Sequence, residues 1–232
     1  MAKANGLPGY YVVIDGVIGC GKTAQRKQLE NYLQLDFPNR EIIFTYEPGG
    51  NLEADLIRQK LKFEKMSPEE EMCLFAKSRS ITLPQIVVPA LREGKIVISD
   101  RSVTTSLAYQ AFGREIGIDR VWEANKEAVN GIFPDAIIYM NVGRETCFKR
   151  SGGEDPDKFD SEDVKFWDRT IKGYDEMLKF IKGISPSTTN IEIYDPEGEL
   201  SIDETRIQIK ERLYPLIRKH YHEGAITRKI QN

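Results

Sequence analysis

Residues 10–23 read YYVVIDGVIGCGKT, a short apolar run that leads into a glycine-rich loop. Gly16, four further residues and then Gly21-Lys22-Thr23 match the phosphate-binding loop that joins a strand to a helix. In such a loop the backbone N–H groups surround phosphate oxygens, and the following helix adds the positive end of its dipole. The pattern therefore predicts a strand, a loop and a helix that bind the phosphates of a nucleotide.

The loop and a second apolar run supply the candidate ATP and metal ligands. Lys22 is expected to reach the β- and γ-phosphates, and the Thr23 hydroxyl to ligate Mg²⁺. Asp100 ends the run Ile-Val-Ile-Ser-Asp, where its carboxylate is expected to hold the Mg²⁺ shell, partly through water. A helix cap at Asp100 is the structural alternative. The residues expected to bind ATP are Gly16, Val17, Ile18, Gly19, Cys20, Gly21, Lys22 and Thr23.

Strand-like and helix-like segments alternate along the chain. Strands are expected at residues 10–15, 41–46, 95–99, 136–141 and 191–194, as continuous apolar runs typical of strands covered on both faces. Helices are expected near residues 22–34, 52–62, 68–92, 102–111, 119–130, 161–182 and 202–220, with Pro84 and Pro89 kinking or ending the third. This order predicts an α/β fold, a doubly wound five-stranded parallel sheet whose ligands bind at the carboxyl ends of the strands.

Composition limits the class of protein. The 232 residues predict one domain, 1–232, with a flexible flap at about residues 150–162, where the sequence is polar and contains glycine and proline. The chain has 33 Lys and Arg and 36 Asp and Glu, a balance that argues against a nucleic-acid polymer as partner. Three scattered cysteines fit a reducing compartment, and no apolar run approaches the roughly 20 residues that span a bilayer. We expect a cytoplasmic protein without a membrane partner.

Five further fragments stand out along the chain: Phe44-Thr-Tyr-Glu47-Pro48-Gly-Gly50, Leu74-Phe75-Ala-Lys-Ser-Arg79, Asp100-Arg101-Ser102, Ser106-Leu-Ala-Tyr109-Gln110 and Phe133-Pro-Asp135. In this order and spacing they resemble thymidylate kinases, the P-loop nucleoside monophosphate kinases that act on dTMP. The match extends from Tyr10 to about Tyr174. The resemblance implies phosphorylation of dTMP to dTDP, with ATP as the donor, Mg²⁺ as the metal and a homodimer as the assembly.

The resemblance also implies roles for single residues. Phe75 would stack on the thymine ring, Arg79 would hydrogen-bond the base edge, and Ser106 and Gln110 would line the base site. Tyr109 would pack on the sugar, where a ribose 2′-hydroxyl would otherwise lie. The remaining implied substrate contacts are Asp15, Glu47, Pro48 and Arg101, with Arg101 gripping the acceptor phosphate. Taken without the other fragments, the four-residue spacing of Phe75 and Arg79 favours a core Phe beside an Arg stem.

The chain departs from the family pattern at several positions. Ile18 stands where these enzymes usually carry an acidic residue, Tyr46 where many have Arg, and Ser102 where Tyr or His is usual. The flap is acidic, with Glu154, Asp155, Asp157 and Asp160, and its remaining cations are Arg150 and Lys158. The resemblance implies a catalytic Arg in either the phosphate-binding loop or the flap, and the loop contains none, so Arg150 is the candidate in the flap.

Two alternatives remain at this stage. A deoxynucleoside kinase would phosphorylate a 5′-hydroxyl and would benefit from a carboxylate base, for which Glu47 is the candidate. A nucleotide-binding protein with weak catalysis would fit the acidic flap and Ile18. Asn125-Lys-Glu-Ala128 lacks the final Asp of a guanine-reading motif, which argues against a GTPase.

Overall fold

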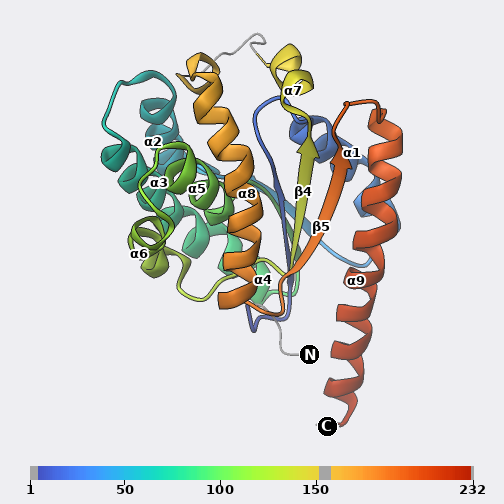
Figure 1. The fold of residues 1–232 in the computed structure, drawn as a ribbon. Helices are drawn as coiled ribbons and strands as arrows, with labels where there is room; N and C mark the ends of the chain where they lie inside the picture. The colour runs from blue at the N-terminus through green and yellow to red at the C-terminus, as the bar shows by residue number, and fades with distance from the viewer. Residues whose placement is uncertain (1–4, 152–157, 231–232) are drawn as a thin grey trace.

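The computed structural model describes residues 5–151 and 158–230. Its centre is a five-stranded parallel sheet in the order β2-β3-β1-β4-β5 (Figure 1). The strands are β1 (Tyr10–Asp15), β2 (Ile42–Tyr46), β3 (Ile96–Asp100), β4 (Ala136–Val142) and β5 (Thr189–Asp195). All five strands predicted from the sequence are confirmed, with ends that differ by at most two residues.

Helices cover both faces of this sheet. They are α1 (Lys22–Asp36), α2 (Leu52–Phe63), α3 (Pro68–Thr82), α4 (Val88–Arg92), α5 (Val103–Ala108), α6 (Ile118–Val129), α7 (Arg144–Arg150), α8 (Val164–Ile184) and α9 (Ile202–Ile230). In Figure 1, α1 and α9 lie together beside β5, while α5 and α8 lie together on the other side of the sheet. Every residue of β1 is buried, because the strand is covered on both faces. This explains why its sequence is continuously apolar.

Two prolines interrupt the long third helix where the sequence predicted a kink or an end. The α-helical hydrogen bonding of α3 ends at Thr82 and resumes at Val88, with a π-helical segment, η1 (Leu83–Val87), between them. Pro84 lies in this segment, where it has no N–H to donate and its ring collides with the carbonyl one turn earlier, whereas Pro89 lies in the first turn of α4 and is tolerated there. The helix predicted at residues 102–111 consists of α5 and a second π-helical segment, η2 (Tyr109–Gly113), which follows α5 directly.

The predicted flap is only partly described. The helix that leads into it, α7, was not predicted, and α8, which follows it, begins at Val164 rather than at residue 161. Lys158–Ser161 forms a single 3₁₀ turn, η3. Glu154, Asp155 and Asp157 lie outside the described residues.

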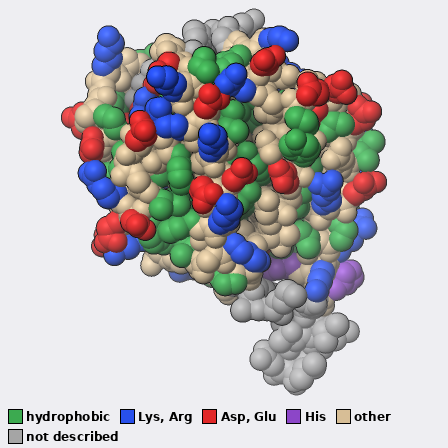
Figure 2. Space-filling model, in the orientation of Figure 1, with side chains coloured by type: hydrophobic (Ala, Val, Ile, Leu, Met, Phe, Trp, Pro, Cys, Tyr) green, Lys and Arg blue, Asp and Glu red, His purple; other side chains and the backbone are tan. Residues whose placement is uncertain are grey.

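Two properties of the whole molecule bear on its partners. Within the described residues, no helix has both the length and the apolar character needed to cross a membrane. On the face shown in Figure 2, acidic, basic and apolar side chains are interspersed.

Candidate active site

The glycine-rich loop leaves the carboxyl end of β1, the central strand of the sheet. Gly19 has a φ of 75°, and a Cβ atom there would lie 2.1 Å from the carbonyl oxygen of Cys147 in α7. Gly21, which precedes α1, has a φ of 98°. Side chains are disfavoured in both conformations, so glycine lets the loop curl tightly and lie against α7.

The Lys22 side chain folds back against the backbone of this loop. Its Nζ donates to the carbonyl oxygens of Gly16 at 2.9 Å and Val17 at 2.8 Å, and it lies 3.5 Å from Cys20 Sγ. The Thr23 side chain, in the first turn of α1, is exposed. The loop therefore presents a cation and a hydroxyl at the N-terminus of a helix, which is the arrangement that binds nucleotide phosphates.

Asp15, the last residue of β1, is hydrogen-bonded to the first residue of the loop. Its side chain is fully buried and accepts hydrogen bonds from the Gly16 N–H at 2.8 Å, Thr105 Oγ1 at 2.8 Å and the Tyr174 hydroxyl at 2.7 Å. Thr104 Oγ1 donates to its other oxygen. The sequence suggested a substrate contact here, but the structure pairs Asp15 with protein donors beneath the cleft. Its substrate role stays a prediction.

A cleft with about 90 Å³ of free volume opens beside the loop. Five of its lining residues were predicted from the sequence: Ile18, Pro48, Phe75, Arg101 and Tyr109. Five were not: Arg58, Leu61, Lys62, Thr105 and Phe159. Arg58 Nη1 donates to the Pro48 carbonyl at 2.9 Å, which holds this cation at the cleft. The lining thus combines three cations with apolar and hydroxyl-bearing side chains, a composition suited to a phosphorylated ligand with a flat ring.

Arg101 is the residue with the most unusual geometry in the cleft. Its φ of 72° is strained for a non-glycine residue, and Ser99 Oγ holds the turn by donating to the Arg101 carbonyl at 2.7 Å. One guanidinium nitrogen, Nη1, is buried and has no hydrogen-bond partner in the described structure. Burial lowers the pKa of Arg101, but the neighbouring tyrosines and Asp15 outweigh burial and raise the pKa above its usual value. The group therefore stays charged and has a donor left for an anion.

Tyr109 joins the cleft to the core. The centre of its ring lies 5.2 Å from the Arg101 guanidinium carbon and 5.7 Å from the centre of the Phe159 ring. Its hydroxyl oxygen accepts from the Ile18 N–H at 3.2 Å. Burial raises the pKa of Tyr109 to about 12, so the phenol is neutral near pH 7.

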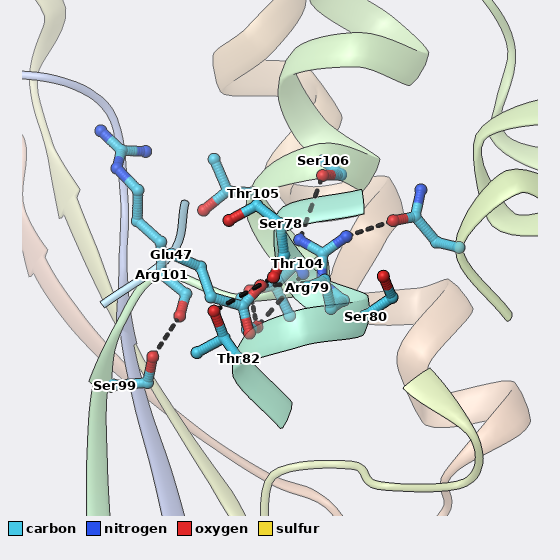
Figure 3. Close-up of polar contacts among 12 residues, drawn as sticks. Glu47, Ser78, Arg79, Ser80, Thr82, Ser99, Arg101, Thr104, Thr105 and Ser106 are labelled. Atoms are coloured by element: carbon cyan, nitrogen blue, oxygen red, sulfur yellow. Dashed lines mark hydrogen bonds and ion pairs between the residues drawn. The ribbon is translucent and has the colours of Figure 1, made fainter. Parts of the chain in front are cut away.

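Glu47 and Arg79 form a buried ion pair behind the cleft, drawn in Figure 3. Arg79 Nε lies 2.8 Å from Glu47 Oε2, although the angle is not that of a hydrogen bond. Arg79 also donates to Ser106 Oγ at 3.3 Å and to Asn125 Oδ1. Burial raises the pKa of Glu47, and Arg79 offsets part of that effect. In Figure 3 the Arg101 side chain extends away from this pair.

The residues predicted to contact the base therefore differ in whether they line the cleft. Phe75 lines the cleft, whereas Arg79, Ser106 and Gln110 are buried behind its wall. Gln110 Nε2 donates to Glu71 Oε1 at 3.2 Å, and its own Oε1 has no partner among the described residues. Sequence reasoning missed Glu71 altogether. Its position one turn before Phe75 on α3 was the available signal.

A second cavity, of about 370 Å³, lies on the other side of the loop. It is lined by Cys20, Gly21, Ala24, Gln25, Met140, Val142, Arg150, Ile193, Asp195, Leu200, Ser201, Ile202 and Thr205. Arg150, the predicted flap cation, lies here rather than at the cleft, and its Nη2 donates to the Gly198 carbonyl at 3.0 Å. Asp100 ends β3 next to β1, and its Oδ1 is buried without a hydrogen-bond partner in the described part of the chain. Two separate spaces thus flank one phosphate-binding loop.

Comparisons with known proteins agree on one family. The family model for thymidylate kinase matches residues 14–192. The chain is 36% identical over 200 residues to the thymidylate kinase of Mesomycoplasma hyopneumoniae (strain 7448), covering 83% of this chain and 94% of that protein. It is 37% identical over 175 residues to that of Thermoanaerobacter sp. (strain X514), covering 75% of this chain and 85% of the relative.

A solved structure shows the same fold. The thymidylate kinase of Ehrlichia chaffeensis superimposes with a TM-score of 0.71 at 23% identity, covering 89% of this chain and 98% of that one. At 23% identity this structural likeness supports the fold alone. The family model and the two relatives support the assignment of the chain to a family. The chain therefore belongs to the thymidylate kinase family, and the reaction that it catalyses is the phosphorylation of dTMP to dTDP by ATP.

Proposed function

We propose that dTMP binds in the 90 Å³ cleft and that Arg101 grips its 5′-phosphate. The observation that carries this placement is the buried, unpartnered nitrogen of Arg101 on a strained backbone beside the phosphate-binding loop. Arg58 adds a second cation to the same cleft. Phe75 offers its ring face to the base, and Tyr109 supports the sugar. A planar guanidinium suits this position because it binds two phosphate oxygens at once.

ATP then lies along the loop, with its base in the second cavity. An oxygen of the acceptor phosphate attacks the γ-phosphorus, the bond to the β-phosphate oxygen breaks, and ADP leaves with that electron pair. The protein aligns the two nucleotides and neutralises the charge that spreads over the transferred group. In this proposal Lys22 acts on the β- and γ-phosphates, and Arg101 on the acceptor. The acceptor phosphate is largely ionised near pH 7, so no general base is needed.

Magnesium fits the donor site. Asp100 has a buried carboxylate oxygen that finds no hydrogen-bond partner within residues 5–151 and 158–230, and the Thr23 hydroxyl is exposed at the start of α1. These two residues would hold the ion, directly or through water. When bound, Mg²⁺ neutralises phosphate charge and fixes the orientation of the phosphate oxygens.

The flap and the assembly complete the proposal. Arg150 lines the second cavity, and this supports assigning it to the donor phosphates during flap closure. The whole chain would act as one kinase domain in the cytoplasm, and family membership favours a homodimer.

The deoxynucleoside-kinase alternative receives less support. A 5′-hydroxyl acceptor would benefit from a carboxylate in the cleft. Glu47, the candidate base, is 3% exposed and ion-paired with Arg79, and no Asp or Glu is among the described residues that line the cleft. Weak catalysis remains the second alternative, since Ile18 lines the cleft where the family pattern has an acid.

A steady-state assay with three acceptors tests the proposal. Turnover is measured with dTMP, dUMP and thymidine at saturating ATP and Mg²⁺. We expect dTMP to have the highest kcat/KM and thymidine to be almost inactive. A tenfold preference for thymidine would establish the nucleoside kinase instead, and negligible turnover with all three would favour the binding protein.

A further inference from the structure

Tyr46 is held in place by a hydrogen bond at the tip of its ring. It is the last residue of β2, in register with Asp100 of β3, so it lies at the edge of the sheet where ligands of such folds bind. Its hydroxyl donates to Asp55 Oδ1 at 2.9 Å, and the Gly50 N–H donates to the same oxygen at 3.1 Å. Burial and the bond to Asp55 raise the pKa of Tyr46, so the phenol keeps its proton near pH 7.

The backbone after β2 fixes the edge of the same ring. Gly49 has a φ of 126°, and a Cβ atom there would lie 2.3 Å from Tyr46 Cε2 and 2.5 Å from Asp55 Oδ1. Glycine therefore lets the chain pass directly against the ring. With its tip hydrogen-bonded and its edge against the backbone, the Tyr46 ring is held in one orientation.

Arg58 lies over the face of this ring. Its guanidinium carbon is 5.2 Å from the ring centre, within the range of about 6 Å for a cation–π contact. Asp55 and Arg58 are three residues apart on α2, so they project from the same face of that helix. One helix thus supplies both the carboxylate that holds the ring and the cation that lies over it.

The held guanidinium belongs to the acceptor cleft, the cleft of about 90 Å³ proposed for dTMP. Arg58 lines this cleft, and its Nη1 donates to the carbonyl of Pro48, another lining residue, at 2.9 Å. An Arg side chain that is already held in place loses less conformational entropy when it binds an anion. The family pattern often has Arg at residue 46, where a second cation would repel Arg58, whereas the face of a tyrosine ring attracts it.

We infer that Tyr46 is a positioning residue for the acceptor: its ring holds the Arg58 guanidinium at the cleft, ready to bind the phosphate of dTMP. The inference rests on the proposed placement of dTMP in this cleft. Tyr46 itself is not among the residues that line the cleft, so its effect passes through Arg58.

The first test measures KM for dTMP and for ATP in Tyr46→Leu and Tyr46→Phe. Leucine removes the ring face, so we expect KM for dTMP to rise roughly threefold to thirtyfold, the size of a cation–π contact, with KM for ATP unchanged. Phenylalanine keeps the ring face and is expected to keep KM for dTMP near the wild-type value. Equal rises in both KM values in Tyr46→Leu, or a Tyr46→Phe as impaired as Tyr46→Leu, would overturn the inference.

Arg58→Met decides whether Tyr46 acts through Arg58. It removes the guanidinium and keeps most of the stem, so Tyr46→Leu is expected to add nothing in the Arg58→Met background. Two effects that multiply would show that Tyr46 acts independently. If Arg58→Met leaves KM for dTMP unchanged while Arg101→Lys raises it, this inference fails and the proposed function stands. If neither variant raises it, the placement of dTMP in the cleft fails.

Tyr32→Leu is the matched control. The Arg206 guanidinium carbon lies 4.6 Å from the centre of the Tyr32 ring, and neither residue is among those that line the cleft or the second cavity. This variant loses the same kind of contact, so both KM values are expected to stay at the wild-type level.

Fluorinated side chains keep the test decisive if Tyr46→Leu fails to fold. Tyr46→Phe is prepared with an increasing number of ring fluorines, which draw electron density from the ring face and change its shape little. We expect the Kd of dTMP, measured by calorimetry without ATP, to rise with each added fluorine. A Kd that does not depend on the number of fluorines would show that the ring face does not hold Arg58.

Discussion

The hydroxyl of Tyr109 accepts a hydrogen bond from the backbone N–H of Ile18 at 3.2 Å, which ties the acceptor cleft to the phosphate-binding loop. The two residues come from different elements, since Tyr109 begins η2 and Ile18 lies in the loop after β1. Both line the cleft. A ligand that displaced the Tyr109 ring would therefore also act on the phosphate-binding loop.

Shrinking this ring is expected to change the choice of sugar. Tyr109→Ala opens space beside the sugar, so we expect the preference for dTMP over ribothymidine monophosphate to fall by about 1–3 kcal/mol, or roughly fivefold to 150-fold in the kcat/KM ratio. The ring is 3% exposed, so the assay is run well below the unfolding temperature of the variant. Tyr109→Phe keeps the ring and loses the hydroxyl, and its sugar preference is expected to be unchanged. An unchanged ratio in Tyr109→Ala would remove Tyr109 from the sugar site.

The buried Glu47–Arg79 pair predicts a pH effect on stability. Burial raises the pKa of Glu47 above its usual value of 4.5, so the folded state binds this proton more tightly than the unfolded chain does. The contribution of Glu47 to the free energy of unfolding therefore decreases as the pH rises from the unfolded pKa through the higher folded pKa. The Glu47→Gln variant lacks this decrease with pH. The difference in melting temperature between the variant and the wild type is therefore expected to change with pH just above 4.5.

Gln resembles the neutral carboxyl group, which is the form that the raised pKa of Glu47 favours in the folded state. We therefore expect the free energy of unfolding of Glu47→Gln to rise relative to that of the wild type as the pH increases from about 4.5 to 7, because only the wild type buries an ionised carboxylate there. Urea unfolding at several pH values measures this difference. A difference between the two proteins that is the same at pH 5 and pH 7 would contradict the raised pKa.

The sheet was predictable because its strands are buried on both faces. Tyr10–Asp15 and Ala136–Val142 read as continuous apolar runs, and turn residues mark where they end. Helix α7 was missed because Arg144–Arg150 is short and mostly charged, with Cys147 as its buried residue. Arg58 was missed for a related reason, since a basic residue on an amphipathic helix looks like a solvent-facing one.

The partners of the site residues were harder to predict. The sequence motifs selected Phe75, Arg101 and Tyr109, which line the cleft. They did not show that Arg79 pairs with Glu47, 32 residues earlier in the chain. Such pairings depend on how helices cross the sheet, and a local pattern does not contain that information. Residue types at a site are therefore more predictable from sequence than the hydrogen bonds that orient them.

Removing the cation of the loop is expected to abolish turnover. Lys22→Ala deletes the ammonium that lies 2.9 Å from the Gly16 carbonyl at the mouth of the loop. We expect kcat to fall by at least about a hundredfold, because a fixed charge at the transferred phosphoryl group is lost. Lys22→Met keeps most of the buried side-chain stem, so it separates the lost charge from lost packing. Its kcat is expected to fall as far as that of Lys22→Ala. Retention of more than about a tenth of the wild-type kcat in either variant would contradict the assignment of Lys22 to the phosphates.

Replacing Arg101 tests whether the acceptor phosphate is read by a two-pronged contact. Arg101→Lys keeps the charge but replaces a planar fork with a point charge. Arg and Lys are equally disfavoured at a φ of 72°, so the backbone strain is the same in both proteins. We expect KM for dTMP to rise and kcat to fall, with kcat/KM for dTMP lower by about tenfold to a hundredfold, because the same contact holds and aligns the acceptor. The KM for ATP is expected to change much less, since Lys22 and the loop hold the donor.

Arg40→Lys is the matched control for this change. Arg40 stacks on the Tyr221 ring at 3.8 Å and is not among the residues that line either cavity. The same substitution there should leave both KM values as they are. Thymidine supplies a further comparison, because it lacks the phosphate that Arg101 is proposed to bind. Its low activity should therefore be similar in the wild type and in Arg101→Lys. If the variant instead raised KM for ATP and left KM for dTMP unchanged, Arg101 would belong to the donor site, and the acceptor phosphate would have to be held by Arg58 and Lys62 across the cleft.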